Sequence, residues 1–203
     1  HPSRLLKMML VFVLSTLVGP KAETLDISQS AILLSPSLKE PVHETVARMV
    51  IEEVEKRSSI VWGKTKSWAT PGQTTIAIAL SRDKNLAGRP IPHRAGKNLV
   101  ERQPEGYRIV TEKRNGTNTI WIIAADTRGA LYGAGYLLRK AVLSANKVLF
   151  PYPLDIATAP EQSIRGHQLG YRNTANSYDA WDAGQYEQYI RELVIFGTNA
   201  IEN

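Results

Sequence analysis

The sequence predicts an α/β protein in which an α+β domain with a mixed sheet precedes the first β-α-β unit of a truncated (β/α)8 barrel. Residues 163–203 read as a strand, a polar loop, an amphipathic helix and the start of a second strand. Before them, a hairpin at residues 107–124 leads directly into a glycine-rich helix. A crossover helix joins parallel strands, and one such unit cannot cover both faces of a parallel sheet. Residues 163–203 are therefore expected to open a larger parallel α/β structure.

The first 22 residues are typical of an export signal. Arg4 and Lys7 precede Met8–Val18, an uncharged and mostly apolar run of eleven residues. That run is too short to span a bilayer, which needs about 20 residues. We therefore expect residues 1–22 to be a signal peptide, cut after Ala22, and the protein to be secreted or periplasmic without stable membrane insertion. The alternatives are a buried or an interfacial N-terminal helix.

Composition and charge limit the possible partners. The chain has 203 residues and no cysteine, which excludes disulfides and thiolate metal sites. Three of the 25 basic residues and none of the 19 acidic residues lie in residues 1–22, so the net charge falls from +6 to +3 without them. The remaining basic residues form no arginine-rich run and no basic face with aromatic residues, so nucleic acid is not an expected partner. No cofactor and no metal site are expected.

Two strands and a helix are predicted in the first half of the 24–150 domain. Ala31–Ser35 is a short apolar run, and Thr74–Leu80 combines alternation with β-branched residues, so both are predicted strands. Val42–Lys56 is a predicted amphipathic helix. Its apolar stripe is Val42, Val46, Met49, Val50 and Val54. The charged residues expected to face water are Glu44, Arg48, Glu52, Glu53 and Lys56.

The second half of this domain is predicted to be a hairpin and a helix. Tyr107–Glu112 and Thr119–Ala124 are strands around Asn115-Gly116, a pair suited to the positive φ angles of a tight turn. Asp126 is expected to cap the helix that follows.

This helix should cover Arg128–Leu143 and lie close to the sheet. Gly129 and Gly133 share one face and leave room for a close approach, and the apolar contacts should come from Leu131, Leu138 and Val142. Phe150–Pro160 contains three prolines, so residues 151–162 are predicted to be a linker.

The last 41 residues are predicted to form the β-α-β unit. Its first strand is about Ile164–Tyr171, its loop is Arg172–Gly184 and its helix is about Gln185–Phe196. Gly197 should end the helix, and the second strand should begin at Asn199.

Two segments resemble parts of known glycoside hydrolases. ADTRGALYG at residues 125–133, after the hairpin, resembles the turn and glycine-rich helix of the small α/β domain that precedes the catalytic barrel. PEQSIRG at residues 160–166 resembles the entry into the first barrel strand. Together they resemble family 20 β-hexosaminidases and family 67 α-glucuronidases over about residues 30–203. The resemblance departs from the hexosaminidase pattern at residues 166–171, which contain no acidic residue.

The resemblance implies an exported enzyme that hydrolyses glycosidic bonds in an oligo- or polysaccharide. The catalytic carboxylates of these families lie on later barrel strands, so no catalytic residue is expected in this chain, which should be inactive by itself. A barrel binds its ligand at the carboxyl ends of its strands. The residues predicted to bind sugar hydroxyls are Arg165, Gln168, Arg172 and Asn176, and those predicted to stack on sugar rings include Tyr171 and Trp181.

Several of these residues also have structural explanations. Arg165 is the best match to a sugar-binding arginine of family 20, but it is equally suited to pair with a structural acid. His167 is expected to be structural. Asp179 should cap the last helix or meet a substrate hydroxyl, and Glu202 is the acid best placed for a site role because it ends the second strand.

Two other functions remain open. The complete protein could bind glycans without cleaving them. Alternatively, Gly133-Ala134-Gly135 could belong to a nucleotide-binding module, although these glycines lie within the predicted helix and close packing explains them better.

Overall fold

The computed structural model describes residues 23–169 and 177–202. The predicted signal peptide and the predicted site residues Tyr171, Arg172 and Asn176 lie outside these ranges. The helices are α1 (Val42–Ser58), α2 (Thr127–Lys140) and α3 (Ala183–Ile195), with 3₁₀ turns η1 (Val100–Arg102) and η2 (Ser177–Ala180). The strands are β1 (Thr24–Asp26), β2 (Ser30–Leu34), β3 (Gly63–Thr65), β4 (Thr74–Leu80), β5 (Asn85–Leu86), β6 (Arg89–Pro90), β7 (Tyr107–Arg114), β8 (Thr117–Ala124), β9 (Val142–Ser144), β10 (Lys147–Pro151), β11 (Asp155–Thr158), β12 (Gly166–Gln168) and β13 (Ala200–Glu202).

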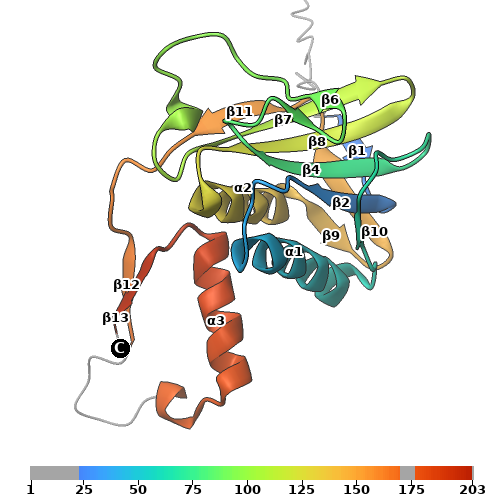
Figure 1. Ribbon diagram of the computed structural model, residues 1–203. Helices are drawn as coiled ribbons and strands as arrows, with labels where there is room; N and C mark the ends of the chain where they lie inside the picture. Colours follow the sequence, from blue (N-terminus) through green and yellow to red (C-terminus); the bar gives the residue numbers. More distant parts are fainter. Residues whose placement is uncertain (1–22, 170–176, 203) are drawn as a thin grey trace, which may run out of the picture.

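A mixed six-stranded sheet with the order β11-β7-β8-β4-β2-β3 forms the centre of the molecule (Figure 1). β3, β2, β4 and β8 are parallel to one another, whereas β7 and β11 run antiparallel to their neighbours. A smaller antiparallel sheet has the order β1-β10-β9. The predicted mixed sheet is therefore confirmed.

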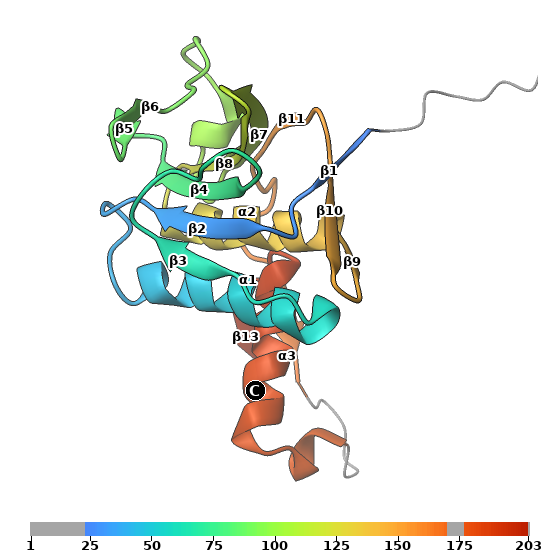
Figure 2. The same cartoon turned by 90° about the vertical axis from the view of Figure 1, so that its right-hand side faces the viewer.

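Both faces of the central sheet are covered, which explains why β4 is buried along its whole length. Helices α1 and α2 lie on one face (Figures 1 and 2). There Ile76, Ile78 and Leu80 of β4 join the main hydrophobic core. On the other face Ala77 and Ala79 belong to a smaller core that includes Trp121 and Leu86. A strand that is buried on both sides needs no polar face, as its sequence TTIAIAL indicates.

Helix α1 buries its predicted apolar stripe except Val42, which is half-buried, and it also buries one charged residue. The carboxylate of Glu53 is fully buried. Glu53 accepts a hydrogen bond from Gln188 Nε2 on α3 at 3.0 Å, and its Oε2 lies 2.8 Å from Arg57 Nη2. The prediction that Glu53 faces water is wrong. Position 53 lies seven residues after Val46, on the same helix face, and α3 covers it.

The hairpin and the α2 cap are confirmed. The turn between β7 and β8 has φ angles of 50° at Asn115 and 76° at Gly116. Asp126 precedes α2 and accepts a hydrogen bond from the Gly129 amide at 2.8 Å. This bond satisfies one of the amide groups that have no partner within the helix.

Helix α2 lies close to the sheet but ends earlier than predicted. A Cβ atom at Gly133 would lie 2.5 Å from Ile122 Cγ2, so only glycine permits this approach. The helix ends at Lys140 instead of Leu143, and β9 begins at Val142. Val142 is 58% exposed, so the apolar contact predicted for it is wrong.

The segment predicted to be a linker is largely sheet. Phe150 is fully buried in β10, and β11 pairs with β7 from Asp155 opposite Val110 to Thr158 opposite Tyr107. The linker prediction for residues 151–162 is therefore wrong as far as Thr158. The prolines do not interrupt these strands, because Pro151 is the last residue of β10, Pro153 lies between β10 and β11, and Pro160 follows β11.

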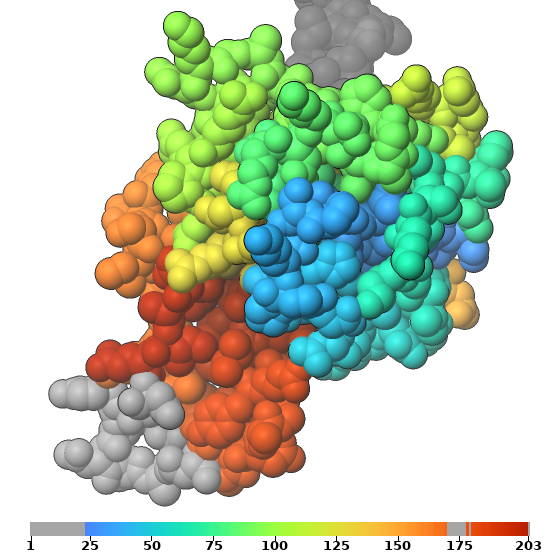
Figure 3. Space-filling model, viewed as in Figure 1, coloured from blue at the N-terminus to red at the C-terminus, as the bar shows by residue number. Residues whose placement is uncertain are grey.

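The predicted β-α-β unit is present at the end of the chain. β12 and β13 are parallel neighbours, and α3 connects them. The capping box of α3 is formed by Asp182 and Gln185. Asp182 lies three residues after Asp179, the residue that the sequence analysis offers as the cap. Figures 1 and 3 show this unit extending from the α1 and α2 layer. Its continuation into a barrel remains a prediction. No helix in the described residues is long and apolar enough to cross a membrane.

Candidate functional site

Two exposed polar residues are paired at the carboxyl ends of β12 and β13. Gln168 lies opposite Glu202 in the parallel register. The ring of His167 contacts that of Tyr189 on α3, edge to face, with centroids 5.7 Å apart. Because side chains alternate along a strand, Gln168 belongs to the face directed away from α3. The Leu169 amide continues the pairing by donating to the Glu202 carbonyl at 2.8 Å.

This pair can bind one small polar ligand. Neighbouring strands are about 4.8 Å apart, so an amide and a carboxylate at paired positions reach the same group. The carboxylate accepts hydrogen bonds, whereas the amide both donates and accepts them. Sugar hydroxyls need such mixed partners. Gly166 and Ala200 precede the pair on the same face, and both are small residues.

Arg165 lies at the other end of β12 and is held by protein groups. Its Nε donates to the Gly197 carbonyl and its Nη1 to the Gln162 carbonyl, each at 2.7 Å. Its Nη2 donates to Glu105 Oε2 at 2.5 Å. The guanidinium carbon lies 5.3 Å from the centre of the Tyr132 ring. These contacts favour the structural explanation of Arg165, with an acid from the α/β domain as its partner.

Glu105 is the centre of a polar cluster that joins the two parts of the chain. Arg128 Nη1 lies 3.0 Å and Asn199 Nδ2 lies 3.3 Å from Glu105 Oε1. Burial by itself would raise the pKa of Glu105, but hydrogen bonds from Arg165, Arg128 and Asn199 outweigh it and hold the pKa below its usual value. The Glu105 amide donates to Asp126 Oδ2 at 2.8 Å, so the α2 cap also fixes this residue.

Trp181 is half-buried in an aromatic cluster beside the start of α3. Its ring centroid lies 4.7 Å from that of Tyr178, 5.4 Å from Tyr186 and 5.2 Å from Tyr189. The Tyr186 hydroxyl donates to the Tyr178 carbonyl at 2.9 Å. Aromatic pairs of this geometry stabilise packing. The described contacts of Trp181 therefore fix η2 against α3.

The structure thus separates the three predicted site residues that it describes. Gln168 lies beside Glu202 at the carboxyl edge, Arg165 lies at the amino end of the same strand, and Trp181 packs on the α3 side. The cluster around Glu105 was not predicted. The only local signal at Glu105 is the glycine that follows it. The φ angle of Glu105, 61°, and its pairing with Arg128 and Arg165 depend on the fold.

One group of potential metal ligands occurs among the described residues, far from this edge in the sequence. Glu40, His43 and Glu44 bring one ligand atom each to within 4.8 Å of one another. Glu44 is already paired with Lys64 Nζ at 2.6 Å, and both glutamates are exposed. Surface ion pairs account for this arrangement.

Comparison with known proteins supports the fold through similarity to solved structures and not through sequence similarity. No protein-family model matches the sequence, and no curated protein matches it. The structure is similar to a GH20 exo-β-N-acetylglucosaminidase from Vibrio harveyi in complex with N-acetylglucosamine, with a TM-score of 0.56 and 14% identity over 88% of this chain and 22% of that one. It is also similar to a GH20 β-N-acetylhexosaminidase from Streptomyces coelicolor A3(2), with a TM-score of 0.56 and 15% identity over 90% and 32% of the two chains.

A third similar structure belongs to another glycoside hydrolase family. A GH138 enzyme targeting pectin rhamnogalacturonan II has a TM-score of 0.52 and 10% identity over 85% of this chain and 18% of that one. This chain therefore spans between about a fifth and a third of the length of these enzymes. The predicted resemblance to family 20 is confirmed for the fold, and the resemblance to α-glucuronidases remains a prediction.

Proposed function

We propose that this chain is part of an exported glycoside hydrolase acting on an oligo- or polysaccharide, and that the carboxyl edge of β12 and β13 lies at its sugar site. One observation carries this proposal: a parallel β-α-β unit follows an α/β domain whose fold is shared with glycoside hydrolases. In a (β/α)8 barrel the ligand binds at the carboxyl ends of the strands. That is the edge at which Gln168 and Glu202 are paired.

Each residue then has a defined role. Gln168 and Glu202 bind sugar hydroxyls, and Tyr171, Arg172 and Asn176, which follow β12 in the sequence, extend the same site. Trp181 fixes η2 against α3. Arg165 positions the first strand through Glu105 and does not bind the sugar. The catalytic carboxylates lie on later strands of the complete barrel, and the first 22 residues direct export.

The test uses the full-length protein that contains this sequence. Its kcat/KM is measured on 4-nitrophenyl β-N-acetylglucosaminide, on the galactosamine analogue and on the α-glucuronide. Glu202→Gln removes the charge of a carboxylate hydrogen bond, which is worth about 1.5–3 kcal/mol, so kcat/KM should fall roughly 10- to 150-fold. Glu55→Gln, an exposed change on α1, is the matched control and should have no effect.

The outcomes separate the competing explanations. Hydrolysis that Glu202→Gln leaves unchanged would place the sugar site elsewhere. A full-length protein that hydrolyses none of these glycosides or a mixed polysaccharide, but binds glycans on an array, would be a carbohydrate-binding protein of the same architecture.

A further inference from the structure

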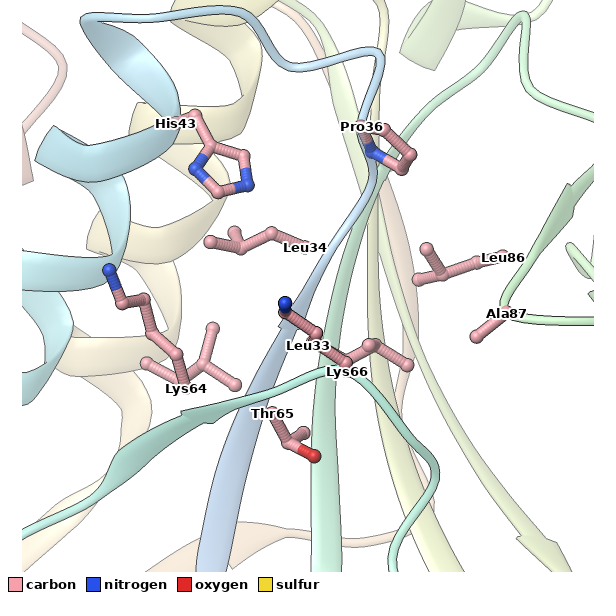
Figure 4. A pocket seen from close by; sticks show the side chains of 10 residues that line it. Leu33, Leu34, Pro36, His43, Lys64, Thr65, Lys66, Leu86 and Ala87 are labelled. Carbon is pink, nitrogen blue, oxygen red and sulfur yellow. The ribbon is translucent and has the colours of Figure 1, made fainter.

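The α/β domain contains a cavity of about 430 Å³ that shares no residue with the β12 and β13 edge. Figure 4 shows side chains of β2, β3, α1 and the β5–β6 arm around it. Most of its lining is apolar and includes Leu33, Leu34, Pro36 and Leu86. Small-molecule sites are mostly apolar concavities of about 300–1,000 Å³ with a few polar groups, so this cavity has the size of a site for a small ligand.

The cavity lies at the carboxyl ends of β2 and β3, beside the β5–β6 arm that follows β4. β2 continues through α1 to β3 on one side, whereas β4, on the other side of β2, leads on to β7 and β8. Directly after these two strands the chain is joined, because Ser35 Oγ donates to Asp83 Oδ2 at 2.7 Å, and the cavity is bounded by β2, β3 and the β5–β6 arm. In open α/β sheets, ligands bind outside the carboxyl ends of the strands, and this cavity lies at that edge of the sheet.

The cationic groups lie on the β3 side of the cavity. Lys64 and Lys66 are two residues apart and so share one face of the chain. The charge of Lys64 is neutralised by Glu44 at 2.6 Å, and His43 lies 3.5 Å from Glu40. Lys66 is exposed and makes no ion pair with the described part of the chain. Lys66 is therefore the cation that is available to a ligand.

The opposite wall is held in a fixed and unfavourable conformation. Ala87, at the turn between β5 and β6, has a φ angle of 43°, and Gly88 has 80°. A left-handed alanine costs about 1 kcal/mol or more. Trp68 Nε1 holds the turn by donating to the Ala87 carbonyl at 3.0 Å, and the Arg89 guanidinium lies 4.2 Å from the Trp68 ring centre. Backbone strain that the surroundings maintain in this way is found at ligand sites.

We propose that this cavity binds a small amphipathic anion, with an apolar body against Leu33, Leu34 and Leu86 and a carboxylate or sulfate group on Lys66. An apolar lining suits such a body better than an unmodified sugar, whose hydroxyls would lose their hydrogen bonds to water. The site is separate from the proposed glycosidase site and does not depend on it.

The test is a fluorescence titration of this 203-residue chain with anilinonaphthalene sulfonate, an apolar ring system with one anionic group. The neutral probe N-phenylnaphthylamine has the same rings without the sulfonate. Leu34→Phe fills the cavity and should raise the Kd for the anionic probe at least roughly tenfold. Lys66→Met removes one exposed cation and should raise that Kd about three- to fivefold without changing the Kd of the neutral probe.

Lys113→Met is the matched control, because Lys113 is an exposed lysine beside the β7–β8 turn, at the other end of the sheet. It should leave both Kd values unchanged. Circular dichroism verifies that each variant folds. If Leu34→Phe does not fold, the result with Lys66→Met decides the proposal alone. The proposal is overturned if no saturable binding of the anionic probe occurs, or if neither cavity variant weakens it. Weakening by Leu34→Phe but not by Lys66→Met would overturn the assignment of an anionic ligand.

Discussion

The contact between Arg165 and Glu105 predicts how the β-α-β unit is held on the α/β domain. Replacing Arg165 by glutamine removes the hydrogen bond to Glu105 Oε2 and those to the carbonyls of Gln162 and Gly197. We expect the unit to open locally while the central sheet stays folded. Most contacts of the sheet lie within the α/β domain, so local opening does not require its unfolding.

The magnitude follows from the burial and the remaining partners. The side chains of Arg165 and Glu105 are 23% and 11% exposed, so the pair is largely desolvated. Breaking a fully buried pair costs 3–5 kcal/mol, and a hydrogen bond to a charged group contributes about 1.5–3 kcal/mol. Arg128 and Asn199 still contact Glu105 in the variant. The range of about 1.5–3 kcal/mol therefore applies, and the equilibrium constant for local opening of the β-α-β unit should rise roughly 10- to 150-fold.

The effect should depend on pH in a defined direction. The pKa of Glu105 is held below its usual value in the folded state, because the hydrogen bonds from its partners outweigh the opposing effect of burial. A carboxyl group of this kind stabilises the fold above its unfolded pKa, about 4.3, and this contribution is lost as the pH falls through the folded pKa. The difference between wild type and Arg165→Gln should be full at pH 7 and should shrink below about pH 4.

Amide hydrogen exchange measures this opening directly. Protection of the β12 and β13 amides should fall in Arg165→Gln, whereas protection of the β4 amides should not change. Arg114→Gln, at an exposed arginine of the β7–β8 hairpin, is the matched control and should alter neither. Unchanged protection of β12 and β13, or an equal loss in β4, would refute the reasoning.

Two further changes test the packing of α2. Asp126→Ala removes the side-chain acceptor at the start of α2 and should lower the free energy of unfolding by about 1–2 kcal/mol, measured by urea denaturation. Gly135→Ala would place a Cβ 2.5 Å from the backbone carbonyl oxygen of Ile195, so α3 must shift, at a cost of about 1–3 kcal/mol. Gly63→Ala, which meets nothing within 4 Å, is its control, and equal stabilities of the two glycine variants would contradict this account.

Local patterns predicted those elements whose causes are local. The Asn115-Gly116 turn, the Asp126 cap and the β4 strand each depend on residues within a few positions of one another, and each is present. The β12, α3 and β13 order also followed from the sequence, because a helix between two short strands leads to parallel pairing. The position of Glu202 at the end of a strand was recognised in the same way.

Features that depend on distant partners were missed. Phe150–Pro160 was predicted to be a linker because its prolines are a local signal, but β11 pairs with β7, which lies more than forty residues earlier. Glu53 was assigned to solvent because it is charged, whereas the arrival of Gln188 from α3 buries it. Both errors have the same cause, since the partner that decides the environment is not part of the local pattern.

The sequence by itself determined the helices and strands that have local signals, the mixed domain followed by a parallel unit, and the resemblance to glycoside hydrolases. Only the tertiary structure decided that Arg165 belongs to the Glu105 cluster, that Gln168 and Glu202 share an edge, and that a cavity lies beside Lys66. The physical reason is that propensities, caps and turns act within a few residues. Burial, ion pairing and cavities arise from surfaces that folding brings together from distant parts of the chain.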